Sequence, residues 1–215
     1  MAEGIYKVTE DFENLLCKYT GSPHAIAIDN QSNALFLCLM YENIKGKEIT
    51  IPSRTYPSVP NAIIHAGGIV KFTPVLGTTL KGAYPLKGTR TIDSALRFTS
   101  NMYVPNTFMC LSFTGPYKHL KLGKGGAILT DDYQAMLWFK RARFSGRREC
   151  SYHTDTFDML GWNFYMEPAK ASLGVLLMGQ FFDPLTGKSK VNKDKELPYP
   201  DLSVFPIYQN KQIKE

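Results

Sequence analysis

The first third of the chain alternates between strand-like and helix-like segments, and this alternation constrains the fold more than any other feature of the sequence. Short apolar runs predict strands at 24–29 (HAIAID), 48–52 (EITIP) and 69–72 (IVKF). Helical spacing of apolar residues predicts helices between them. Further strands at 107–113 and 127–130 and a helix from 131 to about 143 follow. The pattern predicts an α/β fold, with a mostly parallel sheet flanked by helices.

The length of 215 residues suits one large domain with an extension. We expect an α/β domain over residues 1–182. From residue 183 onward the chain is rich in Lys and Pro and has little periodicity. We therefore expect an extended C-terminal tail over 183–215, docked through Tyr199, Phe205 and Tyr208.

The net charge of +6 raises the question of a nucleic-acid partner. The basic residues are spread along the chain, and their densest group, within 140–148, is typical of a solvated helix face. No basic stripe interleaved with aromatic residues is present, so we expect no nucleic-acid partner. No apolar run is long enough to span a bilayer, and the first residues lack signal-peptide character. We expect a cytoplasmic protein with no membrane partner, and no metal, because histidines and cysteines lack ligand spacing.

Ligands of α/β sheets bind beyond the carboxyl ends of the strands, so polar residues at these points are candidate site residues. Asp93 ends a predicted strand, and Lys118 lies in a glycine-rich stretch that follows the strand 107–113. A lysine held away from water can act as a nucleophile and form a Schiff base with an aldehyde cofactor such as pyridoxal 5'-phosphate (PLP). On this signal alone, a solvated surface lysine remains the alternative.

Six motifs in order strengthen the lysine hypothesis. The segment 112–126 (SFTGPYKHLKLGKGG), followed by AILTDD, resembles the DegT/DnrJ/EryC1/StrS family of PLP-dependent sugar aminotransferases. Segments 26–39, 51–56 (IPSRTY), 92–95 (IDSA), 143–146 and 160–174 (LGWNFYMEPAKASLG) resemble further family motifs. The resemblance extends over roughly residues 8–180. It implies the large domain of the PLP-transferase fold type I, reduced in size.

The resemblance implies catalytic roles for two residues. Lys118 would hold the cofactor and move the proton during amino transfer. Asp93 would pair with the protonated pyridine nitrogen and so keep the ring an electron sink. Tyr56 would stack on the ring.

The resemblance also implies a set of phosphate ligands. Ser32, together with the backbone amides of Gln31 and Asn33, would bind the phosphate at a helix N-terminus, where free N–H groups favour anions. Ser112 would add a hydroxyl. Asn163 would reach the phosphate of a neighbouring subunit, which implies a homodimer with shared active sites.

The function implied by the family is transfer of an amino group from glutamate or glutamine to a keto-sugar, usually linked to a nucleotide, in polysaccharide biosynthesis. The alternative is a non-catalytic relative that binds PLP or a sugar nucleotide, or a structural or partner subunit.

Four departures from the family pattern favour that alternative. Gln31 stands where the family has glycine, and Leu96 stands where it has Gln or His. A strand–helix unit is missing between Phe72 and Asp93, where the Gly- and Pro-rich segment 81–88 predicts a loop. The C-terminal domain is missing after about Phe182.

Overall fold

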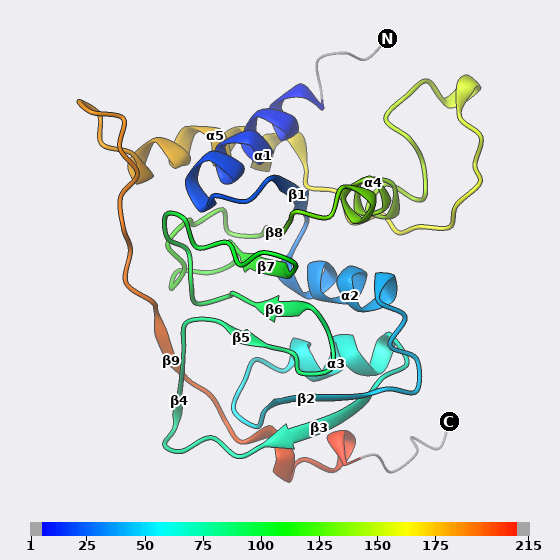
Figure 1. Ribbon diagram of the computed structural model, residues 1–215, viewed down its shortest axis with the longest axis vertical. Helices are drawn as coiled ribbons and strands as arrows, with labels where there is room; N and C mark the ends of the chain where they lie inside the picture. The colour runs from blue at the N-terminus through cyan, green and yellow to red at the C-terminus, as the bar shows by residue number, and fades with distance from the viewer. Residues whose placement is uncertain (1–5, 210–215) are drawn as a thin grey trace.

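A five-stranded sheet of order β1-β8-β7-β6-β5 forms the centre of the molecule (Figure 1). The computed structural model describes residues 6–209. The strands are β1 (His24–Ile28), β2 (Glu48–Pro52), β3 (Ile69–Thr73), β4 (Thr79–Lys81), β5 (Tyr84–Pro85), β6 (Thr91–Asp93), β7 (Phe108–Ser112), β8 (Gly126–Thr130) and β9 (Glu196–Pro198). The helices are α1 (Lys7–Thr20), α2 (Gln31–Tyr41), α3 (Ser58–His65), α4 (Tyr133–Ala142) and α5 (Pro168–Met178), with short 3₁₀ turns at Tyr152–Thr154, Gly179–Phe181, Leu202–Val204 and Pro206–Tyr208.

The sheet is mixed, which corrects the expectation of mostly parallel pairing. Strand β8 pairs antiparallel with both β1 and β7, β6 pairs parallel with β7, and β5 pairs antiparallel with β6. It follows that β1, β7 and β6 all point in one direction. The carboxyl ends of these three strands therefore meet at the same edge of the sheet, as the sequence-based argument requires.

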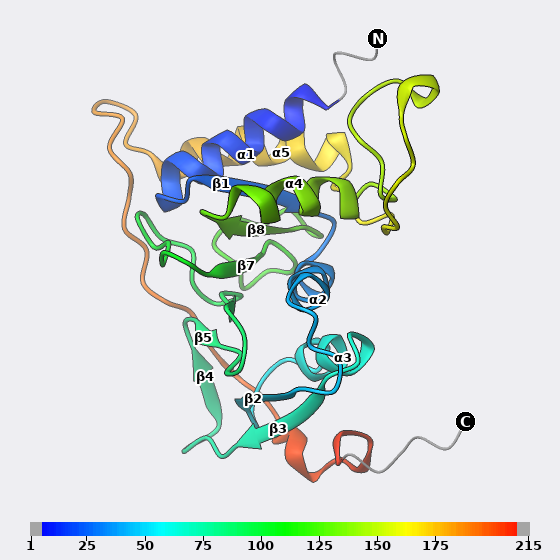
Figure 2. The same cartoon turned by 45° about the vertical axis from the view of Figure 1, so that its right-hand side comes forward.

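Alternate residues of the strands pack into two separate cores. Ile26, Phe108 and Cys110 face one core, which α2, α3 and α4 help to close. Ala27 and Met109 face the other core, which α1 and α5 cover. Helices thus lie on both faces of the sheet (Figure 2), and the predicted α/β class is confirmed.

Local chemistry fixes where the helices begin. The side chain of Asn30 accepts a hydrogen bond of 2.9 Å from the Asn33 amide and caps α2. Asp132 caps α4 in the same way, through a 2.9 Å bond from the Ala135 amide. Each cap satisfies one of the N–H groups that the first turn of a helix leaves free.

The predicted gap between the third strand and Asp93 contains short strands in place of a strand–helix unit. Strand β4 pairs with β9, and β5 forms a hairpin with β6. Strands β2 and β3 form a separate parallel pair. Two backbone hydrogen bonds of 3.0 Å between Thr50 and Lys87 link that pair to the segment after β5.

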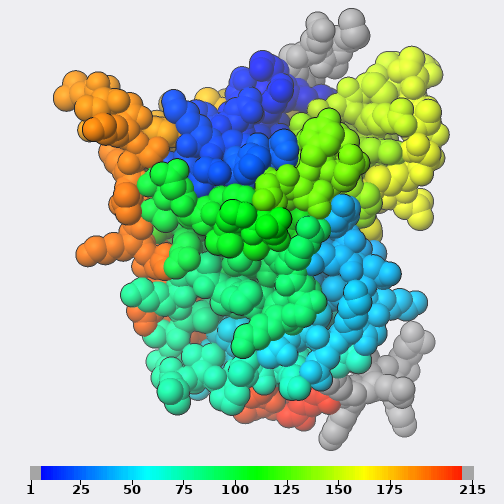
Figure 3. Space-filling view, viewed as in Figure 1, coloured from blue at the N-terminus to red at the C-terminus, as the bar shows by residue number. Residues whose placement is uncertain are grey.

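The C-terminal segment lies along one side of the molecule. It runs from α5 past the loop after β6 to pair with β4 (Figure 1), and its orange and red atoms lie against the molecule in the space-filling view (Figure 3). Arg97 anchors it through two hydrogen bonds to Asp194, of 2.9 and 2.7 Å. Tyr208, near its described end, packs edge-on against Phe72 with the ring centroids 6.1 Å apart.

Candidate functional site

Three residues at or just after the ends of β1, β6 and β7 lie at the same edge of the sheet. Gln31 begins α2 shortly after β1, while Asp93 ends β6 and Ser112 ends β7. The β7 strand joins them, because Asp93 pairs with Cys110 and the Gln31 side chain donates a 3.1 Å hydrogen bond to the Cys110 carbonyl. The sequence therefore places Gln31 and Asp93 together as predicted from strand ends.

The Asp93 carboxylate is the buried centre of this site, with a residue exposure of 3%. Its Oδ1 accepts hydrogen bonds from the Gln31 side-chain amide at 2.5 Å and from the Ala95 backbone amide at 2.8 Å. Its Oδ2 accepts a bond of 2.7 Å from the Tyr84 hydroxyl. All three donors are uncharged, and within residues 6–209 no cationic side chain comes close enough to Asp93 to form an ion pair.

Lys118 lies in the loop between β7 and β8, half-buried. Its Nζ donates a hydrogen bond of 2.9 Å to the carbonyl of Ala95, two residues after Asp93. Burial lowers the pKa of Lys118, and the charge of Asp93 partly opposes that shift. Lys118 thus lies beside the segment that follows Asp93, within reach of the charge of that carboxylate. That the two residues hold one cofactor between them stays a prediction.

Gly126 allows the helix that carries Gln31 to approach the sheet closely. A Cβ atom at this position would lie 2.6 Å from the Gln31 backbone nitrogen and 2.9 Å from the Leu111 carbonyl oxygen, closer than van der Waals contact permits. The second glycine of the Gly-Gly turn is therefore required for the N-terminus of α2 to sit beside β8.

Sequence reasoning missed Tyr84 and Thr55 as members of the site. The Tyr84 hydroxyl lies 2.5 Å from Thr55 Oγ1 in addition to its bond with Asp93. Both residues are buried. Thr55 belongs to the predicted motif 51–56, but Tyr84 lies in a segment that was expected to be a loop. Only the pairing of Tyr84 with Asp93 across the β5–β6 hairpin brings it to the carboxylate.

Tyr56 is 58% exposed and does not lie deep in the site. Its ring meets Tyr199 of the C-terminal segment edge-on, with centroids 6.5 Å apart. Burial raises the pKa of Tyr199 to about 12, and the Asp93 charge adds to the shift. The backbone around Tyr199 is held by a 2.9 Å bond from Arg54 to its carbonyl. The C-terminal segment thus places Tyr199 against Tyr56 and near the charge of Asp93.

The predicted phosphate ligands are dispersed in a single chain. Ser32 lines a cavity of about 470 Å³ between α2 and α3, whose other walls include Trp162 and Phe164. Asn163 lies between those two aromatic residues and is exposed. Ser112 accepts a long bond of 3.5 Å from the Thr114 amide. Neither Asp93 nor Lys118 lines the 470 Å³ cavity.

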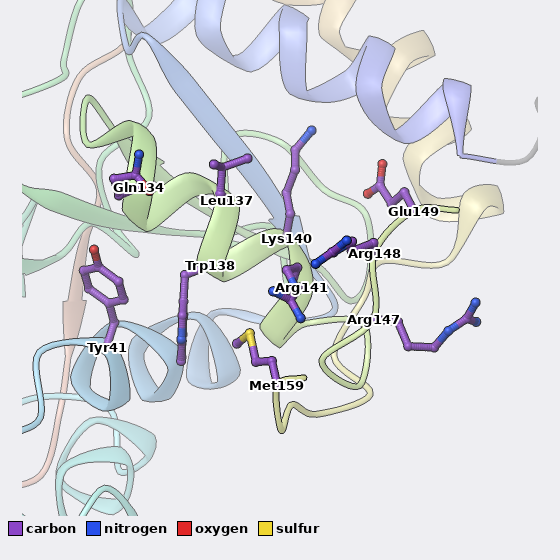
Figure 4. Close-up of a pocket in the computed structure, with 10 residues that line it drawn as sticks. All are labelled: Tyr41, Gln134, Leu137, Trp138, Lys140, Arg141, Arg147, Arg148, Glu149 and Met159. Carbon is purple, nitrogen blue, oxygen red and sulfur yellow. The ribbon is translucent and has the colours of Figure 1, made fainter. Parts of the chain in front are cut away.

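A larger cavity of about 630 Å³ lies on the outer side of α4 (Figure 4). Tyr41 and Trp138 form part of its wall, together with Arg141 and Met159. Arg141 is already engaged, since it bonds the Gly146 carbonyl and pairs with Asp158. The cavity includes none of the predicted site residues.

Metal-binding and membrane-spanning features are absent from the described part of the chain. No group of three or more His, Cys, Asp or Glu residues is placed to hold a metal ion. None of its helices combines the length and the apolar character that crossing a bilayer requires.

Comparison with known proteins gives one family. The sequence profile of the DegT/DnrJ/EryC1/StrS aminotransferase family matches residues 3–82 and 105–193. The chain is 39% identical over 67 residues to a GDP-perosamine synthase of Caulobacter vibrioides, which covers 31% of this chain and 17% of that protein.

Solved structures extend the similarity to the fold. A Bacillus cereus protein assigned as a PLP-dependent aminotransferase superimposes with a TM-score of 0.66 at 18% identity, over 80% of this chain and 58% of that one. Helicobacter pylori PseC, an aminotransferase involved in the biosynthesis of pseudoaminic acid, gives a TM-score of 0.63 at 16% identity, over 80% and 57%. The chain therefore spans less than two thirds of the length of each of these proteins.

Proposed function

The chain belongs to the DegT/DnrJ/EryC1/StrS aminotransferase family, and on that premise we propose that it is a PLP-dependent aminotransferase. The reaction would move an amino group from glutamate or glutamine to a keto-sugar of the nucleotide-linked kind that the name of the Caulobacter relative indicates. The observation that carries the proposal is that a buried carboxylate, Asp93, and a half-buried lysine, Lys118, lie at the same edge of the sheet, with Lys118 Nζ bonded to the carbonyl of Ala95, two residues after Asp93.

The surroundings of Asp93 fit the ring of PLP. An ionised carboxylate has about four acceptor positions. Three are filled by Gln31, Ala95 and Tyr84, which leaves about one on Oδ2. A buried charge with only neutral partners is stabilised most by a cationic donor, and a protonated pyridine nitrogen is such a donor. PLP bound in this way supplies an electron sink for the substrate's electrons.

Lys118 has the properties of an amine that bonds an aldehyde and carries a proton. Its lowered pKa increases the neutral fraction of Nζ, which is the nucleophilic form. The Ala95 carbonyl orients Nζ through the 2.9 Å hydrogen bond. After amino transfer begins, the same Nζ would take up and return a proton at the reacting carbon.

The phosphate would be bound at the start of α2. The Gln31 backbone N–H belongs to the first turn of an 11-residue helix, where partial positive charge favours anions. The Asn33 amide, predicted to contribute as well, is instead bonded to Asn30 Oδ1 at 2.9 Å. The Ser32 and Ser112 hydroxyls would add donors. Asn163, which is exposed, would serve a second copy, so we propose a homodimer that shares its sites and acts in the cytoplasm in polysaccharide biosynthesis.

Two features favour a second candidate, a non-catalytic relative that keeps a binding site. The Gln31 amide bonds Asp93, and Tyr199 of the C-terminal segment packs against Tyr56, the residue predicted to stack on the ring. A protein with this arrangement could bind PLP or a sugar nucleotide without turnover, or act as a partner subunit.

Absorbance spectroscopy separates the two candidates. Purified protein mixed with PLP is expected to develop a visible band, and borohydride reduction followed by mass spectrometry is expected to place the label on Lys118. The Lys118→Ala variant is expected to lose both signals, whereas Lys121→Ala, which removes an exposed lysine of the same loop, is expected to keep them. Loss of the band on addition of glutamate or glutamine supports the aminotransferase. A band that persists supports the binder, and no band in the wild type rejects the cofactor.

A further inference from the structure

We propose that Tyr84, oriented by Thr55, is a positioning residue that aims the free acceptor position of Asp93 at the ring nitrogen of the cofactor. The inference rests on the proposed function, because it concerns the same carboxylate. It assigns a role to Tyr84, which lies outside the motifs and the family match, and to Thr55, a member of the motif 51–56 to which the sequence assigned no role.

The hairpin of β5 and β6 places the two side chains together. Tyr84 is the direct cross-strand partner of Asp93 in an antiparallel pair, so the two side chains stand on the same face of the hairpin. The Tyr84 hydroxyl reaches Asp93 Oδ2 at 2.7 Å. Residues 83–104, which include both Tyr84 and Asp93, lie outside the segments that the family profile matches.

The direction of the hydrogen bonds follows from the number of protons. A phenol carries one proton, and an ionised carboxylate can only accept. Tyr84 must therefore donate to Asp93, and Thr55 must donate its own proton to the Tyr84 oxygen, 2.5 Å away. Burial and the Asp93 charge raise the pKa of Tyr84 well above its usual value, so the hydroxyl remains a donor at all physiological pH values.

This chain of bonds fixes the orientation of the carboxylate. Oδ1 is held by Gln31 and the Ala95 amide, and Oδ2 is held by Tyr84 alone. Without the hydroxyl, nothing else described here would bond Oδ2, and the remaining lone pair would lose its fixed direction. Thr55 is 1% exposed, so its hydroxyl has no access to water and keeps the Tyr84 oxygen as its hydrogen-bond partner. The aim of Oδ2 thus depends on a tyrosine and a threonine from two different parts of the fold.

A pair of ligands tests the proposal. We would measure the dissociation constants of PLP and of its deaza analogue, in which a C–H group replaces the ring nitrogen. The proteins would be the wild type, Tyr84→Phe, Thr55→Val and Thr55→Ser. Tyr103→Phe is the matched control: its hydroxyl also makes two hydrogen bonds, in this case with the backbone groups of Thr107 and Asp131 at the opposite edge of the sheet.

Tyr84→Phe is expected to weaken PLP binding about fivefold to twentyfold, because a hydrogen bond to a charged group is lost, and to change binding of the analogue less than twofold. Thr55→Val should show a smaller loss of the same kind. Thr55→Ser should restore wild-type affinity, and Tyr103→Phe should match the wild type for both ligands. Equal losses for the two ligands would show a purely structural role and overturn the proposal, as would unchanged PLP binding in Tyr84→Phe. A wild type that binds neither ligand would reject the proposed function and this inference with it.

Discussion

The side-chain amide of Gln31 lies 2.5 Å from Asp93 Oδ1 and 3.1 Å from the Cys110 carbonyl oxygen. The first residue of α2 is thereby tied to the ends of two adjacent strands, β6 and β7. Where the family has glycine, this chain has a residue that bonds the central carboxylate. Gln31 is consequently part of the site, because its side-chain amide bonds the Asp93 carboxylate.

Gln31→Glu is expected to make stability depend strongly on pH. It would put a second carboxylate within hydrogen-bonding distance of Asp93, and two such groups cannot both ionise at low cost. One pKa of the pair would be raised in the folded state above its unfolded value. The variant should therefore be close to wild-type stability near pH 4 and lose stability as the pH rises to 7, measured by thermal unfolding.

Gln31→Ala is the control for that experiment. It removes the same two hydrogen bonds without adding a charge, so it should cost about 0.5–1.5 kcal/mol for each bond at every pH. Parallel pH profiles for the two variants would contradict the expected coupling between position 31 and Asp93.

Lys118→Met is expected to lose PLP binding while keeping or gaining stability at pH 7. Burial lowers the pKa of Lys118 in the folded state below its unfolded value. The charged lysine therefore lowers the free energy of unfolding at neutral pH. This loss of stability disappears above the unfolded pKa. The Tm of the variant should be within about 2 °C of the wild type or above it at pH 7, and any advantage should vanish near pH 11. A large loss of stability at pH 7 would show that the lysine serves mainly to hold the Ala95 carbonyl.

The ion pair of Glu13 and Arg143 is expected to contribute to folding more than any exposed pair. Both side chains are 5% exposed, and Glu13 also accepts a 2.8 Å bond from the Ala27 amide. Glu13→Gln should lower the free energy of unfolding by about 3–5 kcal/mol, because a buried guanidinium loses its main counter-charge. Urea denaturation measures this.

The contrasting variant is Glu48→Gln, which breaks the exposed pair with Lys71. It should change the free energy of unfolding by no more than about 0.5 kcal/mol. A similar small effect in Glu13→Gln would mean that Arg143 finds enough compensation in Glu149, 3.2 Å from it.

Arg97→Ala is expected to loosen the C-terminal segment. The variant loses both hydrogen bonds to Asp194, a pair worth about 1 kcal/mol at partial exposure. Trypsin should then cleave at the lysines of that segment about fivefold faster. Mass spectrometry of the peptides released over time measures this rate. Arg90→Ala, whose partners Glu42 and Asp132 lie elsewhere, should leave the cleavage rate unchanged.

Much of the fold was predictable because the strands are short, apolar and buried. The predicted strand at 48–52 coincides with β2, and those at 24–29 and 69–72 differ from β1 and β3 by one residue. Strand direction was not predictable, since apolar runs look alike whether a strand runs with its neighbour or against it. The segment around Tyr84 was expected to be a loop, because Pro85 lies within the two-residue strand and Gly82 and Gly88 lie on either side of it.

The site was predictable where it depends on the end of a strand, as for Asp93 and Gln31. It was not predictable where it depends on hairpin register, as for Tyr84, or on the path of the C-terminal segment, as for Tyr199. Ser32 and Asn163 stay predictions as phosphate ligands. They would contact the same phosphate only in a homodimer with PLP bound.

Few of the backbone hydrogen bonds described here join the β2–β3 pair to the rest of the molecule: two link Thr50 and Lys87, and one of 2.8 Å runs from the Leu202 amide to the Ser53 carbonyl just after β2. Such a narrow connection lets the pair, together with α3, open as a unit at a lower free energy than the five-stranded sheet. Amide hydrogen exchange should then be faster in β2 and β3 than in β7 and β8. Because Thr55 follows β2 directly, each opening would withdraw it from Tyr84, so the rate of this local unfolding would set how long the carboxylate stays aimed.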